Sequence, residues 1–233
     1  MPHIICTAGN DQHLRIWDVR YLSKLQPTAA EALEAPKTED GQEKEISTHP
    51  TSNIPYDRVT SYMKGAKGKG LLRASFQHGK SCSAAYWDPF GRRILTTSYD
   101  DKLRVWTLNP QSFMLDAPLA ATHFKPSKVI PHDCQTGRWL TILRAQWSLN
   151  TEYMPHFTVG NMKRRLDVVA ATGDKIVSLW TEGYVQLLGE AEKKLTYSVT
   201  AVPAVTASHP NRVDCLVGGN TSGRIQLWTS GEE

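Results

Sequence analysis

The chain has 233 residues, of which 40% are hydrophobic and 21% are charged, and its formal net charge is +4. This composition is that of an ordinary globular protein, and it excludes a collagen-like, coiled-coil or fully disordered chain. No apolar run approaches the roughly 20 residues that span a bilayer, and the first residues lack the basic start and apolar stretch of a signal peptide. We therefore expect a soluble, intracellular protein.

Three segments share one pattern, in which a short apolar strand and a polar turn precede an alternating strand that ends in Trp. They cover residues 4–18, 94–106 and 215–228, and a weaker copy without Trp covers 156–168. Alternation of apolar and polar residues is typical of a half-buried strand. Further strands are expected at 71–76, 83–87 and 204–208, the last two running into turns that contain Pro. The repeats predict an all-β protein.

The charge and composition change in residues 21–55, which hold six acidic side chains against three basic ones. The rest of the chain therefore carries +7. Residues 21–70 are rich in Glu, Lys, Thr, Pro and Gly, and such a segment buries too little apolar surface to offset the entropy of ordering it. We divide the chain into the end of one repeat at 1–20, a disordered insertion at 21–70 and further repeats at 71–233.

These repeats resemble WD repeats, the four-stranded blades of a β-propeller, and the pair His78-Gly79 followed by Trp106 is the fullest copy. The wider sequence, including 77–82, 95–100, 137–141 and 159–164, resembles the fungal WD-repeat DNA damage-binding proteins. These are relatives of the small subunit of the UV-damaged-DNA-binding complex. The resemblance implies a ring of seven blades, of which this chain supplies about three and a half. We therefore expect it to be the C-terminal part of a longer protein.

His78, Ser98 and Asp100 could be mistaken for a catalytic triad. The WD resemblance instead implies a buried hydrogen-bond network of the blade-opening His, a strand hydroxyl and the Asp that lies six residues before the Trp. No nucleophile motif or oxyanion-hole sequence accompanies the three residues. The sequence therefore predicts a protein that is not an enzyme.

No motif predicts a cofactor or a metal ion. Residues 65–70 are rich in Gly and Lys but lack the order of a phosphate-binding loop. The His132-Asp133-Cys134 run has no second pair of ligands at a matching spacing, and the four cysteines lie far apart as expected of reduced thiols. We expect no cofactor, no metal site and no small-molecule substrate.

The segment 129–147 is the most informative for function. It begins as a loop, places Arg138 and Trp139 at the tip or exit, and is expected to continue as an alternating strand from Leu140. In the UV-damage-binding relative the corresponding loop is a wedge that enters the minor groove at a lesion. The resemblance therefore places Arg138 and Trp139 at the wedge and Arg144 at a basic position that follows it. Gly137 stands where the relative has an aromatic residue. That Trp139 packs inside a blade stays an alternative.

Loops between blades and turns between the second and third strands of a blade lie on one face of a propeller. Basic side chains near such segments, with Trp139 and Tyr99 beside them, would neutralise phosphates and stack on bases. These cations are Lys80, Arg138, Lys163, Arg164, Lys193 and Lys194.

A second candidate site surrounds the first Trp-Asp pair. Residues 5–20 resemble the docking box for the large damage-binding adaptor of cullin-RING ubiquitin ligases. In that resemblance Asp11, Trp17, Asp18 and Arg20 are the docking residues. The alternative is an ordinary blade ending with a surface Arg.

The function expected from these features is nuclear binding of single- and double-stranded DNA, with preference for UV-damaged DNA, in DNA metabolism and repair. The alternative is a protein-interaction scaffold, such as a ubiquitin-ligase substrate receptor or a chromatin adaptor, in which the basic residues are incidental. We expect no association with membranes.

Overall fold

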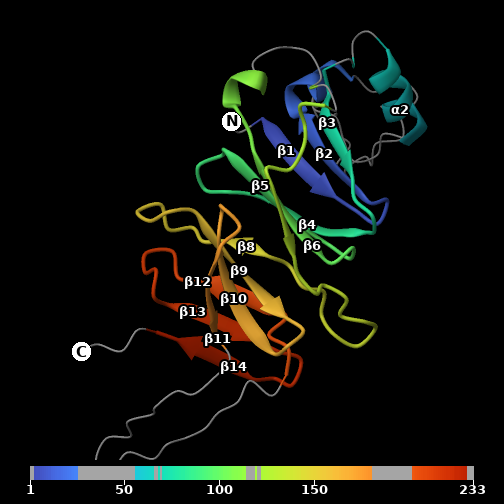
Figure 1. Cartoon of the computed structure of the whole chain (residues 1–233). Helices are drawn as coiled ribbons and strands as arrows, with labels where there is room; N and C mark the ends of the chain where they lie inside the picture. Colours follow the sequence, from blue (N-terminus) through green and yellow to red (C-terminus); the bar gives the residue numbers. More distant parts are fainter. Residues whose placement is uncertain are drawn as a thin grey trace, which may run out of the picture. The chain divides into compact units, whose positions relative to one another are not determined.

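The computed structural model describes residues 3–25, 56–65, 68, 70–113, 119, 122–179 and 201–229. The chain divides into two compact units. Unit 1 comprises residues 1–6, 15–76 and 110–124, and unit 2 comprises 7–14, 77–109 and 125–233. Figure 1 shows the strands and helices of both units. No helix within the described part of the chain is long and apolar enough to cross a membrane.

The first sheet has three antiparallel strands in the order β1-β2-β3. Their bounds are β1 Ile4–Ala8, β2 His13–Asp18 and β3 Leu72–Gln77. Strand β2 alternates buried with half-buried residues along its whole length, as the sequence alternation predicts. The 3-10 helix η1, Val19–Lys24, follows β2 directly, and a second 3-10 helix, η3, covers Pro110–Phe113.

Helix α2, Tyr56–Lys64, lies inside the segment for which the sequence predicted disorder. The Tyr62 hydroxyl of this helix donates a hydrogen bond of 2.8 Å to the backbone carbonyl of Tyr21 in η1. After the helix, a Cβ on Gly70 would stand 2.2 Å from the Tyr21 ring, so only glycine allows this close approach. Residues 26–55 of the predicted insertion lie outside the described residues.

Unit 2 contains three antiparallel sheets. Two have four strands, in the orders β4-β5-β6-β7 and β11-β10-β9-β8, and the third has the order β12-β13-β14. The strands are β4 Cys82–Trp87, β5 Arg93–Ser98, β6 Lys102–Thr107, β7 Lys128–Pro131, β8 Gln146–Trp147, β9 His156–Asn161, β10 Arg165–Ala170, β11 Lys175–Leu179, β12 Val205–Ser208, β13 Leu216–Gly219 and β14 Ile225–Trp228. Successive four-stranded meanders are the architecture of propeller blades, so the predicted all-β propeller class is confirmed.

The core of unit 2 joins the first two of its sheets. Leu95 and Val105 from one sheet pack in a single buried cluster with Phe157 and Val159 from the next. Trp147 meets Phe157 edge to face at 5.4 Å, and its indole Nε1 donates a hydrogen bond of 3.0 Å to the Tyr86 carbonyl. Edge-to-face aromatic pairs add stability beyond the area that they bury. These contacts hold neighbouring sheets of unit 2 in a fixed relation.

Four connections of unit 2 gather at one end of its sheets, at residues 78–81, 99–101, 132–139 and 161–164, which we call the loop face. Backbone hydrogen bonds connect them: Tyr99 N donates to the Ser81 carbonyl and His132 N donates to the Asp101 carbonyl. The His132 ring adds a bond of 2.8 Å from Nε2 to the Gly160 carbonyl. The β4–β5 and β8–β9 connections lie at the opposite end, since consecutive turns of an antiparallel meander alternate between ends (Figure 1).

Candidate nucleic-acid interface

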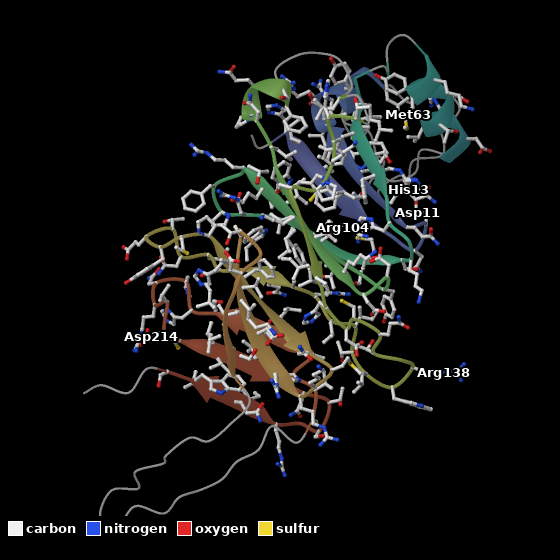
Figure 2. All side chains as sticks on the ribbon, viewed as in Figure 1. Asp11, His13, Met63, Arg104, Arg138 and Asp214 are labelled. Atoms are coloured by element: carbon white, nitrogen blue, oxygen red, sulfur yellow. The ribbon has the colours of Figure 1, made fainter. Side chains whose placement is uncertain are left out.

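The loop that follows β7 exposes the tip residues predicted from the sequence. Trp139 is 87% exposed, which excludes the alternative that it packs inside a blade. Gly137 has φ +67°, a conformation that favours glycine, and it turns the chain immediately before Arg138 and Trp139. Arg138 is exposed as well, and Figure 2 shows it at the outer end of this loop. The exposed Trp139 ring is apolar surface that is available for contact with a ligand.

The base of this loop is bound tightly to the β5–β6 turn. The Asp101 carboxylate accepts hydrogen bonds from the backbone N–H of Cys134, at 3.2 Å, and from the side-chain amide of Gln135. The Tyr99 hydroxyl lies 3.0 Å from the Thr136 hydroxyl and forms a hydrogen bond with it. The tip therefore projects from a fixed base.

The strand predicted from Leu140 does not form, because strand β8 covers only Gln146–Trp147. The backbone before it bonds to side chains instead of to a neighbouring strand. Ala145 N donates to the Thr97 hydroxyl at 2.9 Å, and the Leu143 carbonyl accepts from the Ser83 hydroxyl at 3.2 Å. Arg144 lies between these two buried residues and is itself exposed.

Three further predicted cations lie on the loop face, and all are exposed. They are Lys80, Lys163 and Arg164. The Lys80 carbonyl accepts a hydrogen bond of 3.1 Å from Ser98. The β9–β10 turn is closed by Asn161, whose side-chain oxygen accepts from Lys163 N at 2.8 Å. The two other cations that the sequence singled out, Lys193 and Lys194, lie outside the described residues.

A cleft of about 710 Å³ opens beside the loop base, lined by residues that include Asp101, Gln135, Lys163, Asp167 and Lys175. Asp101, Gln135 and Lys175 were not predicted from the sequence, because they come together only when two sheets pack side by side. Lys175 Nζ lies 3.4 Å from the buried Asp167 carboxylate, while the Lys175 side chain is 55% exposed. This ammonium group is a further cation beside Lys163.

Buried polar groups of this cleft are paired. Asp167 accepts hydrogen bonds from Asn161, at 2.7 Å, and from the Ser178 hydroxyl. Burial would raise the pKa of Asp167, but these two hydrogen bonds and nearby Lys175 lower it below the ordinary value. Burial lowers the pKa of His132, so its ring is neutral.

Of the three residues that resemble a catalytic triad, Ser98 and Asp100 share a hydrogen bond, since Ser98 Oγ accepts from Asp100 N at 3.5 Å, and His78 bonds to other groups. The His78 ring lies 3.2 Å from the Gln12 carbonyl through Nδ1 and 3.0 Å from the Thr96 hydroxyl through Nε2. Because a carbonyl only accepts, we infer that Nδ1 donates and Nε2 accepts. Burial lowers the His78 pKa to about 4, consistent with a neutral ring. Ser98 lies two residues beyond Thr96 on β5 and donates to the carbonyls of Lys80 and Ser81.

Asp100 is paired with Arg104 on β6. The guanidinium donates two hydrogen bonds, of 3.0 and 2.6 Å, and Gly79 N donates a third of 3.1 Å. Burial would raise the Asp100 pKa, but these bonds lower it to about 2. The predicted network is therefore found in part: the strand hydroxyl bonded to His78 is Thr96, whereas Asp100 bonds to Arg104 and to Gly79 N. The bonds of Asp100 stabilise the turn that carries Asp101.

The proposed docking residues fall in both units, and each is placed within its own. Asp11 is exposed in the β1–β2 turn of unit 2, where its carboxylate accepts from His13 N at 3.2 Å (Figure 2). In unit 1, the Asp18 carboxylate is buried and accepts two hydrogen bonds from the Arg20 guanidinium, at 2.9 and 2.6 Å. Arg20 keeps 48% of its side chain exposed. Trp17 is half-buried on β2.

Among the described residues, no group of three or more His, Cys, Asp or Glu residues could hold a metal ion. All four cysteines are free thiols. Burial raises the pKa of Cys134 to about 12, so this thiol is an unreactive, protonated group.

Comparison with known proteins agrees with the repeat pattern. Residues 70–107, which contain β3 to β6, match the family described as WD domain, G-beta repeat. The crystal structure of Chaetomium thermophilum Raptor aligns with 99% of this chain and 15% of its own at a TM-score of 0.50 and 16% identity, which supports the fold alone.

Two curated relatives extend the match to the whole chain. DNA damage-binding protein CMR1 of Cryptococcus neoformans var. neoformans serotype D is 61% identical over 100% of this chain and 39% of its own length. The protein of the same name from Mycosarcoma maydis is 29% identical over 98% of this chain and 41% of its own. The chain thus spans about two fifths of the length of these relatives. Over its length the chain is thus similar to part of the fungal proteins named DNA damage-binding protein CMR1, and residues 70–107 match a WD repeat.

Proposed function

We propose that unit 2 binds DNA through its loop face and prefers duplexes whose base stacking is weakened by damage, including damage by UV light. The observation that carries this proposal is the 87% exposure of Trp139, next to Arg138, on a loop whose base is fixed. The names of the curated relatives, DNA damage-binding protein, support the same ligand. The compartment that follows from this function is the nucleus.

The mechanism is binding without a chemical step. Lys80, Lys163 and Arg164 lie where they can neutralise phosphates, and such contacts position a protein without reading the sequence. The Trp139 indole would stack on, or insert beside, a base. Inserting a wedge requires unstacking of a base step, which costs least where damage has already disrupted the stack. A contact between one base and an aromatic ring contributes about 1–3 kcal/mol. The combination would bind all DNA weakly and damaged DNA more tightly.

Binding to intact and UV-irradiated duplexes, measured by fluorescence polarisation over a series of salt concentrations, tests the phosphate contacts and the preference for damaged DNA. Lys163→Glu with Arg164→Glu should weaken binding to every DNA and reduce the slope of log K against log salt by about 2, since each phosphate contact contributes about 0.9. The matched control is Arg92→Glu with Lys125→Glu, which reverses two exposed charges outside the loop face. Equal effects of the two pairs would show that the loop face is not the site.

Trp139→Ala separates lesion preference from general affinity. We expect the affinity for intact duplex to change little and the preference for irradiated duplex to fall by about tenfold or more, which corresponds to the loss of one stacking contact. Because Trp139 is exposed, its removal should leave the unfolding temperature unchanged. Unchanged preference in this variant contradicts the wedge.

A second candidate function, docking of a ubiquitin-ligase adaptor, is favoured by the geometry of Arg20. The Arg20 guanidinium donates two hydrogen bonds to the buried Asp18 carboxylate, which hold it in one orientation while about half of the Arg20 side chain stays accessible. A preorganised cation loses little entropy when it binds a partner. Co-purification of an adaptor that persists in Arg20→Ala would contradict this role. If the native chain does not bind DNA even at low salt, the scaffold function is favoured over the DNA-binding function.

A further inference from the structure

The β5–β6 turn holds two neighbouring carboxylates with different partners. Asp100 binds Arg104 within its own sheet, whereas Asp101 binds the loop that carries Arg138 and Trp139. Asp101 has φ +60°, a conformation unusual for a residue other than glycine. This backbone geometry directs two adjacent residues to two different elements.

Asp101 makes contact with the loop at three successive points. Its carbonyl accepts from His132 N at 3.0 Å, and its carboxylate accepts from Cys134 N at 3.2 Å and from the Gln135 side chain. Tyr99 adds the bond to Thr136, which lies two residues before the tip. Every residue from 132 to 136 except Asp133 is therefore hydrogen-bonded to this turn or buried against it.

We propose that Asp101 is the positioning residue of the DNA interface: it fixes the Arg138–Trp139 tip before DNA arrives and thereby sets the preference for damaged duplex. This inference rests on the proposed function. A tip that is ordered in the free protein has already lost its conformational entropy on folding. DNA binding then costs little further entropy, and the full free energy of Trp139 stacking contributes to affinity. The ordered tip therefore increases the affinity for DNA that stacks on the indole. It does not increase the affinity for intact duplex, which is held through its phosphates.

Electrostatics alone predicts the opposite outcome, which makes the role of Asp101 testable. A carboxylate on a basic face repels phosphates, so its removal should strengthen binding to all DNA. Positioning instead predicts that removal weakens binding to damaged DNA while binding to intact DNA stays the same or becomes tighter. The ratio of the two affinities therefore distinguishes a positioning carboxylate from a merely charged one.

The informative variant is Asp101→Gly. Glycine adopts φ +60° without strain, so this change removes the carboxylate and keeps the turn. Asp101→Asn is the conservative variant, because its oxygen can still accept from Cys134 N and its amide can bond to a reoriented Gln135 side chain. Asp174→Gly is the matched control: it removes an exposed carboxylate whose side chain bonds only locally, to Thr172 at 2.7 Å. Tyr99→Phe weakens the same loop base without changing charge.

Affinities would be measured for an intact duplex and for the same duplex with one abasic site, which lacks a stacked base. We expect Asp101→Gly to reduce the preference for the abasic duplex about tenfold, Tyr99→Phe to reduce it less, and Asp101→Asn and Asp174→Gly to retain it. Amide hydrogen exchange at Cys134 and Thr136 should accelerate in Asp101→Gly. If Asp101→Gly does not fold, the ratio of affinities measured for Tyr99→Phe tests the proposal instead.

Trp139→Ala distinguishes a failure of the positioning role of Asp101 from a failure of the proposed function. If Trp139→Ala loses the preference while Asp101→Gly and Tyr99→Phe keep it, the positioning role is wrong and the proposed function stands. If Asp101→Gly weakens both duplexes equally, the positioning role is also wrong, because Asp101 then acts through general stability. If Trp139→Ala keeps the preference, the wedge itself is wrong, and with it the role of Asp101.

Discussion

The ion pair between Arg104 and Asp100 offers the sharpest test of the structural network, through the variant Arg104→Met. The two side chains are 8% and 10% exposed, and two hydrogen bonds join them. Methionine keeps most of the aliphatic volume but removes both donors. The Asp100 carboxylate then retains the Gly79 amide at 3.1 Å and loses its compensating charge. Removing one partner of a buried pair costs about 3–5 kcal/mol, and the slight exposure of both groups places the expected loss near 3 kcal/mol.

The pKa of Asp100 gives an independent estimate of that loss. Its value falls from the ordinary 3.8 to about 2 in the folded protein. A lowered carboxyl pKa stabilises the fold at every pH above the unfolded value, and this contribution disappears as the pH falls through the folded value. Here the difference corresponds to about 2 kcal/mol at pH 7. In Arg104→Met, burial without the guanidinium raises the Asp100 pKa, so the gap between variant and native protein should narrow as pH falls from 7 to 4.

Urea unfolding followed by tryptophan fluorescence at pH 7 and pH 4 measures both effects. Arg212→Met is the control, because Arg212 binds Asp214 with similar geometry, at 3.0 and 3.3 Å, but with side chains 51% and 32% exposed. An exposed pair contributes about 0–1 kcal/mol. A loss below about 1 kcal/mol for Arg104→Met, or one that does not change with pH, would refute the reasoning.

Two further predictions concern stability. His78 has a pKa of about 4 when folded against 6.5 otherwise, so the unfolded chain takes up a proton first as pH falls, and the fold should lose about 3 kcal/mol between pH 6.5 and 4. In His78→Gln the unfolding free energy should depend less on pH in this window, and an equal dependence would contradict a neutral buried ring. Gly160→Ala should destabilise by about 3 kcal/mol or more in the same urea assay, because its Cβ would lie 1.9 Å from the Pro203 carbonyl oxygen. Gly219→Ala is its control, with nothing within 4 Å of the new atom, and should cost under about 0.5 kcal/mol.

The sequence predicted strands well where alternation and a terminal Trp coincided. Residues 94–106 cover all but the first residue of β5 and the last residue of β6, and they end in the fully buried Trp106, as the pattern required. Alternation failed from Leu140 onward, because Leu143 and Ala145 are buried against side-chain hydroxyls of another sheet and not in a strand ladder. The apolar Ile142 of the predicted alternation is 39% exposed, so here the tertiary contacts of the loop override the periodicity.

The resemblance proposed Arg138 and Trp139 as site residues, and both are exposed; their role in binding stays a prediction. The residues that hold this loop were not predicted. Asp101 was missed because its partners Cys134 and Gln135 lie 33 and 34 residues away in sequence, and no local pattern signals such a contact. Helix α2 was missed because the composition around it is polar, and its contact with Tyr21 depends on tertiary packing.

The two adjacent carboxylates of the β5–β6 turn are proposed to have different roles: Asp100 stabilises the fold, and Asp101 positions the loop for DNA binding. Asp100 faces Arg104 and supports its own sheet, while Asp101, at φ +60°, supports a loop between sheets. If this division holds, Arg104→Met lowers the free energy of unfolding and leaves the ratio of affinities for damaged and intact DNA unchanged in the protein that remains folded. Asp101→Gly does the reverse. Loops held by a rigid scaffold commonly carry binding function, and here one turn connects the scaffold to the loop.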